Sequence, residues 1–293
     1  MIESYAPTNG YKTFYKIFNE KSKLTPIVAL HGGPGSTHHY MLGLSKLAEI
    51  GHKVILFDQA GSGNTKHNLS KEEMVFETFI DQLDSLTDYL NLSKYNLIGH
   101  SWGGILAIEY LVRAAEENKK HSINKVVISS GMYSIPFYEK CIAKLIEDLS
   151  EENKEIILRN IKNGTPDSDE FLKAHEEYDN KHIFRGKVWP ELYRSPKGFF
   201  YSELYHYMWG SSESYVADGS LYTWDRTNDL HKISIPTLVT CGEFDELTPE
   251  QAQICADLIP NAELKVFEGA SHCHHVESED EYMKTLSEFF NKN

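Results

Sequence analysis

The chain has 293 residues, 41% hydrophobic and 12% aromatic, which suffices for one large core or a core with an inserted subdomain. Its formal net charge of -14, with no tract rich in Lys or Arg, argues against nucleic acid and anionic membranes as partners. Four scattered cysteines indicate neither a disulfide framework nor a zinc site. Because the N-terminus has no apolar signal region and no apolar run is long enough to span a membrane, we expect a soluble cytoplasmic protein.

The first ninety residues predict strands and helices in alternation. Alternating polarity over residues 11–18 and a short apolar run over 26–30 predict two strands. A helix over 40–49, a strand over 53–57 and an amphipathic helix over 74–90 follow. This alternation favours a mostly parallel sheet with helices on both faces.

The glycine-rich run His31-Gly32-Gly33-Pro34-Gly35 comes directly after the second of these strands. So many glycines allow the backbone to approach another group closely, and in a hydrolase that group is the substrate's carbonyl oxygen. We therefore expect the Gly33 amide to donate to that oxygen, and His31 to hold the loop by hydrogen bonding. A plain tight turn is the alternative interpretation.

The segment from 97 to 104, Leu-Ile-Gly-His-Ser-Trp-Gly-Gly, is the motif around which the chain is organised. A buried strand over 95–98 and helical periodicity over 105–112 place Ser101 in the turn between them, the context of a nucleophile elbow. The next amide, that of Trp102, then lies at a helix N-terminus, where developing negative charge is favoured. With Gly33 it would form a two-donor oxyanion hole, whereas the alternative is an ordinary turn with a surface serine.

After a strand over 125–130 the alternation of predicted strands and helices stops. Residues 132–228 show helical stretches and no convincing strand, and the strand and helix alternation resumes beyond them. We therefore predict an α/β core formed by 1–131 and 229–293, with a helical cap over 132–228. The cap is rich in aromatic residues, which either form its own core or line an apolar pocket above Ser101.

A serine nucleophile needs a base and an acidic residue that orients the base, and in this architecture they follow in the order Ser, Asp or Glu, His. Asp245 lies in the loop after the strand over 236–241 and is the candidate acid, although an Asp there could simply cap the next helix. His272 comes first in the small-residue turn after the last strand and is the preferred base, with His274 and His275 as competitors.

No cofactor is indicated. The loop from Asp58 to Gly63 has Lys66 where a dinucleotide loop needs its third glycine, and there is no Gly-Lys-Ser/Thr phosphate loop. The run His272-Cys273-His274-His275 has no matching ligand group elsewhere, which argues against a metal site.

Four motifs together resemble the proline iminopeptidase family of α/β-hydrolases: His-Gly-Gly-Pro-Gly at 31–35, Asp-Gln at 58–59, Gly-His-Ser-Trp-Gly-Gly at 99–104 and Gly-Glu-Phe-Asp-Glu-Leu-Thr-Pro at 242–249. The resemblance covers nearly the whole chain and is greatest to the branch that trims short peptides for the archaeal tricorn protease. It implies Ser101 as nucleophile, Asp245 as orienting acid and His272 as base, with Gly33 and Trp102 as oxyanion donors.

The resemblance also implies a pair of glutamates that hold the substrate's free amino terminus. Glu246 matches the one beside the catalytic Asp, and Glu213 matches the one in a cap motif of the type Met-x-Gly-Pro-x-Glu-Phe. Tyr205 is implied as a further contact of the amine. The cap motif departs from the family pattern, because Ser211 replaces the proline and Tyr215 lies one place beyond the aromatic position.

Two further departures concern the core. His100 stands where many relatives have Gln, and the segment 60–65 lacks the Arg often found after Asp-Gln. Both favour a general aminopeptidase or amino-acid amidase activity over a strict preference for proline.

The expected function is that of a serine aminopeptidase which releases N-terminal proline and other apolar residues from short peptides. Its partners would be peptides or aminoacyl amides with a free N-terminus; a protease partner is left open. The alternatives are an amino-acid amidase, an esterase or lactonase on the same fold, and a non-catalytic ligand-binding protein. An epoxide hydrolase would need Asp at position 101.

Overall fold

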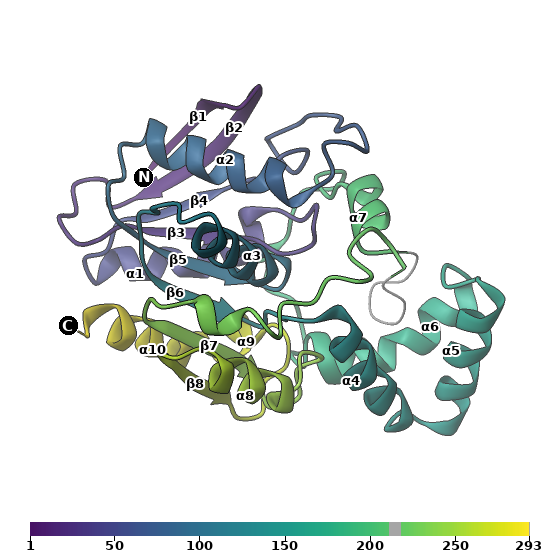
Figure 1. The fold of residues 1–293 in the computed structure, drawn as a ribbon. Helices are drawn as coiled ribbons and strands as arrows, with labels where there is room; N and C mark the ends of the chain where they lie inside the picture. The colour runs from purple at the N-terminus through teal and green to yellow at the C-terminus, as the bar shows by residue number, and fades with distance from the viewer. Residues whose placement is uncertain (211–217, 293) are drawn as a thin grey trace.

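A computed structural model describes residues 1–210 and 218–292, and in it eight strands form one sheet in the order β1-β2-β4-β3-β5-β6-β7-β8 (Figure 1). The strands are β1 (Ile2–Thr8), β2 (Tyr11–Phe18), β3 (Ile27–Leu30), β4 (Val54–Phe57), β5 (Tyr95–His100), β6 (Ile123–Ser129), β7 (Thr237–Gly242) and β8 (Ala262–Phe267). β1 and β2 pair antiparallel, as do β2 and β4, and every other pair is parallel. The mostly parallel sheet predicted from the sequence is confirmed.

Helices cover both faces of the sheet, and the central strands therefore bury both sets of side chains. In β3, Val28 and Leu30 join the core beneath α2 (Phe76–Tyr89), α3 (Trp102–Glu116) and α8 (Pro249–Leu258). Ile27 and Ala29 join the opposite core, beneath α1 (Lys46–Glu49) and α10 (Glu279–Asn291). Burial on both faces explains why this strand appears in the sequence as a continuous apolar run.

The structure differs from the predicted elements in two places. β1 was not predicted, because every other residue at its start is exposed and the segment is polar overall. The expected helix over 40–49 is instead a 3-10 segment, η1 (His38–Ser45), followed by the single turn of α1. Gly43 lies within η1, where a Cβ would come within 2.6 Å of Glu279 Oε1, so this segment packs more closely against α10 than a side chain would allow.

Between β6 and β7 the chain makes the insertion that the sequence suggested as a cap. Its helices are α4 (Ile135–Glu147), α5 (Glu151–Asn163), α6 (Asp169–Tyr178) and α7 (Ser202–Met208), with the short turns η2 (Asp179–Ile183) and η3 (Glu191–Tyr193). They lie to the right of the sheet in Figure 1. The two ends of the insertion pair with each other, since the Arg226 amide donates to the Tyr133 carbonyl and the Ile135 amide to that of Trp224. The division of the chain into domains at 131 and 229 stays a prediction.

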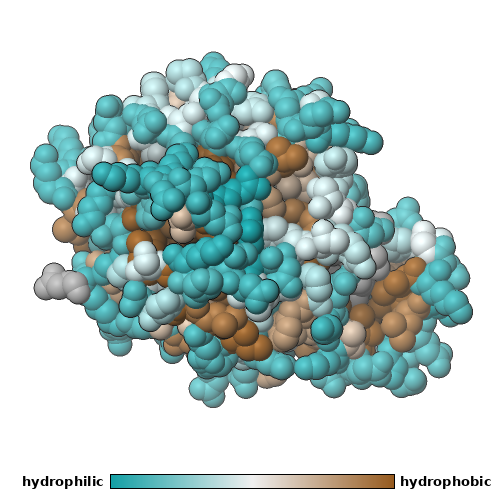
Figure 2. Space-filling model, viewed as in Figure 1, coloured by the Kyte–Doolittle hydropathy of each residue, from teal (hydrophilic) through white to brown (hydrophobic). Residues whose placement is uncertain are grey.

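The remaining elements are η4 (Leu230–Lys232), before β7, and α9 (His274–Glu277), after β8. Figure 2 shows hydrophilic residues over most of the visible face and hydrophobic residues gathered at the lower right, over the inserted helices. Exposed apolar side chains of that segment include Leu158 in α5 and Leu172 in α6. Within the described residues, no helix has the length and apolar character needed to cross a bilayer.

Candidate active site

Ser101 occupies the sharp turn between β5 and α3 and has φ of +55° and ψ of -122°. Positive φ is rare for a residue with a side chain, so the surrounding structure must hold this conformation in place. Two glycines permit the turn. A Cβ on Gly99 would lie 2.1 Å from the Gly103 carbonyl oxygen, and one on Gly103 would lie 2.2 Å from the Leu30 carbonyl oxygen. The strand, turn and helix of a nucleophile elbow are therefore present at Ser101.

Asp245 and His272 meet in the loops that follow β7 and β8. The His272 Nδ1 atom lies 3.0 Å from Asp245 Oδ1. Asp245 is fully buried, and its carboxylate also accepts hydrogen bonds from the Ser130 hydroxyl at 2.5 Å and the Leu247 amide at 2.9 Å. Burial raises the pKa of Asp245, but His272, His274 and the Ser130 hydroxyl together outweigh burial and bring this pKa below its usual value. The ionised carboxylate orients the imidazole with Nδ1–H as donor.

The two competing histidines point elsewhere. His274 is buried, with its ring nitrogens 3.0 Å from the Thr240 hydroxyl and 3.2 Å from that of Ser130. The Nε2 atom of His275 lies 3.2 Å from the Tyr40 carbonyl oxygen. Burial lowers the pKa of His274 to about 4 and that of His275 to about 3. Of the three, only His272 contacts Asp245 and also lines the cavity that holds Ser101.

That cavity has a volume of about 310 Å³ and is lined by both core and inserted residues. Ser101, His272 and Gly33 lie on its core side. The Trp102 amide is at the first position of α3, where an N–H has no acceptor within the helix. The role of the Gly33 and Trp102 amides as oxyanion donors stays a prediction.

Gln59 ties the two donor-bearing segments together. Its Oε1 accepts from the Trp102 indole at 2.9 Å, and its Nε2 donates to the His31 carbonyl at 2.7 Å. The Gln59 amide also donates to His31 Nε2 at 2.9 Å, so His31 holds this loop by hydrogen bonding as expected. The relative position of the glycine-rich loop and α3 is thus fixed by one buried side chain.

Glu246 lies beside Asp245 and His272 and is mostly buried, with 8% of its surface exposed. One carboxylate oxygen, Oε1, is 3.9 Å from His272 Nδ1. The other, Oε2, accepts from the hydroxyls of Tyr138 at 3.1 Å and Tyr178 at 3.3 Å. Burial, and next the charge of Glu246, raises the pKa of Tyr138 well above its usual value, so this phenol remains a donor. Neither tyrosine has a local signal in the sequence, because α4 and α6 reach this loop only through the tertiary fold.

Of the other two residues implied in amine binding, the structure describes one, Tyr205. Tyr205 is buried in α7, where its ring packs against those of Phe200 and Trp209. Tyr138 packs on the same Trp209 ring, which brings Tyr205 to the Glu246 side of the site. Glu213, with Ser211 and Tyr215 of its motif, lies outside the described residues.

A hydrogen-bonded chain that sequence reasoning missed links the glycine-rich loop to the base. The Gly32 amide donates to the Tyr40 hydroxyl at 2.5 Å, and that hydroxyl lies 3.1 Å from His100 Nδ1. On the other side of the ring, His100 Nε2 lies 3.0 Å from the His272 carbonyl oxygen, which can only accept. Burial lowers the pKa of His100 well below its usual value. The ring is therefore neutral, donates through Nε2 and accepts from Tyr40 through Nδ1.

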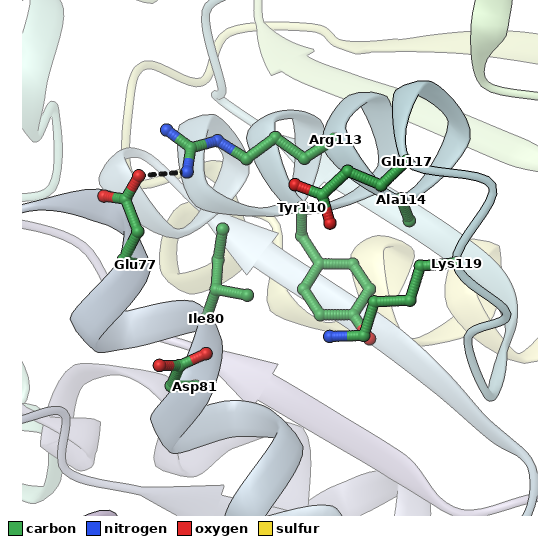
Figure 3. Close-up of a pocket in the computed structure, with 8 residues that line it drawn as sticks. All are labelled: Glu77, Ile80, Asp81, Tyr110, Arg113, Ala114, Glu117 and Lys119. Carbon is green, nitrogen blue, oxygen red and sulfur yellow. Dashed lines mark hydrogen bonds and ion pairs between the residues drawn. The ribbon is translucent and has the colours of Figure 1, made fainter.

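A second pocket, of about 110 Å³, lies between α2 and α3 (Figure 3). Arg113 and Glu77 form an ion pair across it, and Tyr110 and Lys119 complete one side. Tyr110 comes nine residues after Ser101, which is about 14 Å along a helix axis. The pocket has no serine, cysteine or histidine among its described lining residues, so it is not the candidate for acyl transfer.

Comparison with known proteins identifies the family. Residues 25–279 match the family model of the alpha/beta hydrolase fold. The chain is 36% identical to a proline iminopeptidase of Lactobacillus helveticus over all of this chain and 98% of that protein, and 37% identical to one of Clostridioides difficile over 100% and 99%. An archaeal proline iminopeptidase, of Saccharolobus solfataricus, is 32% identical over 99% of this chain and 92% of that protein.

Solved structures agree with this result. The proline iminopeptidase of Mycobacterium smegmatis superimposes with a TM-score of 0.88 and 27% identity, over 99% of this chain and 97% of that one. VinJ superimposes with a TM-score of 0.91 and 29% identity, over 99% and 98%. The narrower resemblance to the tricorn-associated branch stays a prediction. The chain belongs to the proline iminopeptidase family of α/β-hydrolases and is a serine hydrolase of the aminopeptidase type.

Proposed function

We propose that the protein releases the N-terminal residue, proline and other apolar residues, from short peptides through an acyl-enzyme formed on Ser101. The observation that carries this proposal is the buried carboxylate of Glu246, 3.9 Å from the imidazole of His272. A buried carboxylate beside a catalytic base favours a cationic ligand, and the free amine of a peptide supplies an ammonium at the required distance from its first carbonyl. Glu213 is proposed as the second carboxylate of this clamp.

The proposed reaction begins when the ammonium docks at Glu246 and the first carbonyl oxygen enters the hole formed by the amides of Gly33 and Trp102. The Ser101 hydroxyl attacks the carbonyl carbon while His272 Nε2 takes its proton, and Asp245 stabilises the imidazolium. His272 then gives the proton to the departing amine. Water, activated by the same histidine, hydrolyses the acyl-enzyme and releases the amino acid.

The surroundings of Glu246 support an apolar first residue. Tyr138 and Tyr205 both pack against the Trp209 ring, with centroid distances of 5.6 and 6.5 Å. A side chain attached next to the docked ammonium would lie against these rings and gain from burial of its apolar surface. Rings of this kind accept proline and also other apolar side chains.

The test is Glu246→Gln, assayed on alanine 4-nitroanilide and on 4-nitrophenyl acetate. Loss of a charge-assisted hydrogen bond costs about 1.5–3 kcal/mol, so we expect kcat/KM on the anilide to fall about 10- to 150-fold. The ester has no amine, and its hydrolysis should change less than about threefold. Glu250→Gln is the matched control, because Glu250 follows in the first turn of α8 and forms an exposed ion pair with Lys144. Equal losses on both substrates would rule out amine recognition by Glu246.

A further inference from the structure

The cavity at Ser101 and the carboxylate of Glu246 are two different parts of the site. Ser101, His272 and Gly33 line the cavity, whereas Glu246 and its two tyrosine partners are not among its lining residues. The inserted segment contributes Trp189, Tyr193, Ser195 and Phe200 as the opposite wall. The site is therefore divided into a carboxylate compartment and a separate, largely aromatic one.

The chemistry of acyl transfer assigns a part of the substrate to each compartment. The amine and side chain of the first residue belong beside Glu246, and the scissile carbonyl belongs at Ser101. The leaving amine must lie next to His272, from which it takes its proton, and His272 lines the aromatic cavity. The chain beyond the scissile bond then has its space in this cavity.

We propose that the cavity is the binding subsite for the second residue of the peptide and that it selects an apolar, above all aromatic, side chain. This inference rests on the proposed function, since the direction of the substrate follows from docking its amine at Glu246.

The walls of the cavity favour an uncharged occupant. Three rings, those of Trp189, Tyr193 and Phe200, lie along the inserted side, and no Asp, Glu, Lys or Arg occurs among the described lining residues. A charged side chain would find no partner there, and desolvating it would weaken binding. The carboxylate of Glu279 touches this wall, where it accepts from the Tyr193 hydroxyl, and it is paired with Lys46 at 2.6 Å, so its charge is already compensated.

Phe200 gives the clearest indication that the cavity awaits an apolar group. Its side chain is 47% exposed although a phenylalanine gains from burial, and it lies on the cavity wall. Its other face packs against the ring of Tyr205, whose centroid is 5.5 Å away. An aromatic second residue would cover the exposed part of this ring and add a ring contact.

Polar contacts hold the segment that carries Phe200 against the core. The Tyr201 amide donates to the Gly35 carbonyl at 2.9 Å, and the Ser195 hydroxyl lies 2.5 Å from that of Thr37. The wall that carries Phe200 is thus hydrogen-bonded to the glycine-rich loop on the core side of the cavity.

The experiment uses dipeptide amides with alanine first and phenylalanine, leucine, aspartate or lysine second, and measures kcat/KM from the release of alanine. We expect kcat/KM for the phenylalanine and leucine peptides to exceed that for both charged peptides about tenfold or more. Phe200→Ala should reduce the advantage of phenylalanine over aspartate about fivefold, equivalent to about 1 kcal/mol. Phe200→Lys should raise kcat/KM for the aspartate peptide relative to that for the lysine peptide. Leu172→Ala, an exposed apolar residue of α6 that does not line the cavity, is the control and should leave the ratios unchanged.

Three outcomes would overturn the proposal while alanyl peptides are still cleaved. One is equal kcat/KM for all four second residues. Another is a preference for lysine, which would show attraction by the acidic protein as a whole rather than an apolar subsite. The third is a change in preference for the first residue, and not the second, in Phe200→Ala, which would place the N-terminal side chain in this cavity. If no free-amine peptide is cleaved and acetate esters are, the proposed function itself fails.

Discussion

Replacing His100 with leucine removes the middle of the hydrogen-bonded chain that joins the glycine-rich loop to the catalytic histidine. The Tyr40 hydroxyl would lose its acceptor, and the His272 carbonyl would lose the Nε2–H donor of His100. The Ser130 hydroxyl also lies 3.1 Å from this carbonyl, but its one proton is donated to Asp245 at 2.5 Å. A buried polar group left without a partner costs about 1–3 kcal/mol, so we expect His100→Leu to lower the free energy of unfolding by about 2–4 kcal/mol. Because His272 and the glycine-rich loop, through Gly32, are held by this chain, kcat should also fall about 10- to 100-fold, with a smaller change in KM.

His100→Gln is the matched variant. A glutamine amide carries an acceptor and a donor separated by one carbon, as the two imidazole nitrogens are, so it can accept from Tyr40 and donate to the His272 carbonyl. We expect this variant to keep kcat within about fivefold of the parent and most of its stability. The interchange also gives a physical reason for the Gln that many members of this family have at the position.

The assay combines urea unfolding, followed by fluorescence, with steady-state kinetics on alanine 4-nitroanilide for both variants and for Tyr40→Phe. Tyr40→Phe breaks the same chain at its other link and should resemble His100→Leu in kcat. If His100→Leu matches the parent in stability and kcat, or if His100→Gln is as impaired as His100→Leu, the chain does not position the base.

Two further predictions concern the stability of the fold. Gly103→Ala places a Cβ 2.2 Å from the Leu30 carbonyl oxygen, a backbone atom that cannot rotate away. We therefore expect the free energy of unfolding in urea to fall by more than about 3 kcal/mol, or the variant not to express in soluble form. An unchanged unfolding midpoint would contradict the elbow geometry. The buried His274 has its pKa lowered to about 4, while the same residue titrates near its usual 6.5 in the unfolded chain. Below that pH the unfolded state binds a proton that the folded state excludes, so the free energy of unfolding should decrease as the pH falls from about 6.5 toward 4, by up to about 1.4 kcal/mol per pH unit for each such histidine. Unfolding measured at pH 5, 6 and 7 tests this. In His274→Gln the free energy of unfolding should depend less steeply on pH. Equal stability at the three pH values would show that the buried histidines do not control acid sensitivity.

The elements that could be predicted from the sequence are those in which burial leaves a regular pattern of apolar residues. Strands such as β3 and β5 bury every residue and appear as continuous apolar runs. α2 and α3 were recognised because their apolar stripes face the sheet. β1 was missed because a half-exposed edge strand has no such signature, and η1 because the approach of Glu279 to Gly43 comes from a distant part of the chain.

The places of Ser101, Asp245 and His272 in the fold were predictable because this architecture puts its functional residues in loops directly after strands, while their roles in catalysis stay a prediction. The choice of His272 over His274 and His275 was less secure in the sequence, since three histidines within four positions share the same local context. Only the fold shows which of them faces Asp245. Tyr138, Tyr178, Tyr40 and His100 had no local signal at all, because each meets its partner across a long separation in sequence.

The most direct test of the proposed activity compares alanine 4-nitroanilide with its N-acetylated form in the unmodified enzyme, with Ser101→Ala as the blank. Acetylation removes the positive charge and leaves the scissile bond unchanged, so Glu246 would be left buried without the ammonium that the site is proposed to bind. We expect kcat/KM for the acetylated substrate to be lower than that for the free-amine anilide by about 100-fold or more. We also expect Ser101→Ala to cleave neither substrate while retaining its fold. Comparable rates on the two anilides would contradict recognition of a free N-terminus.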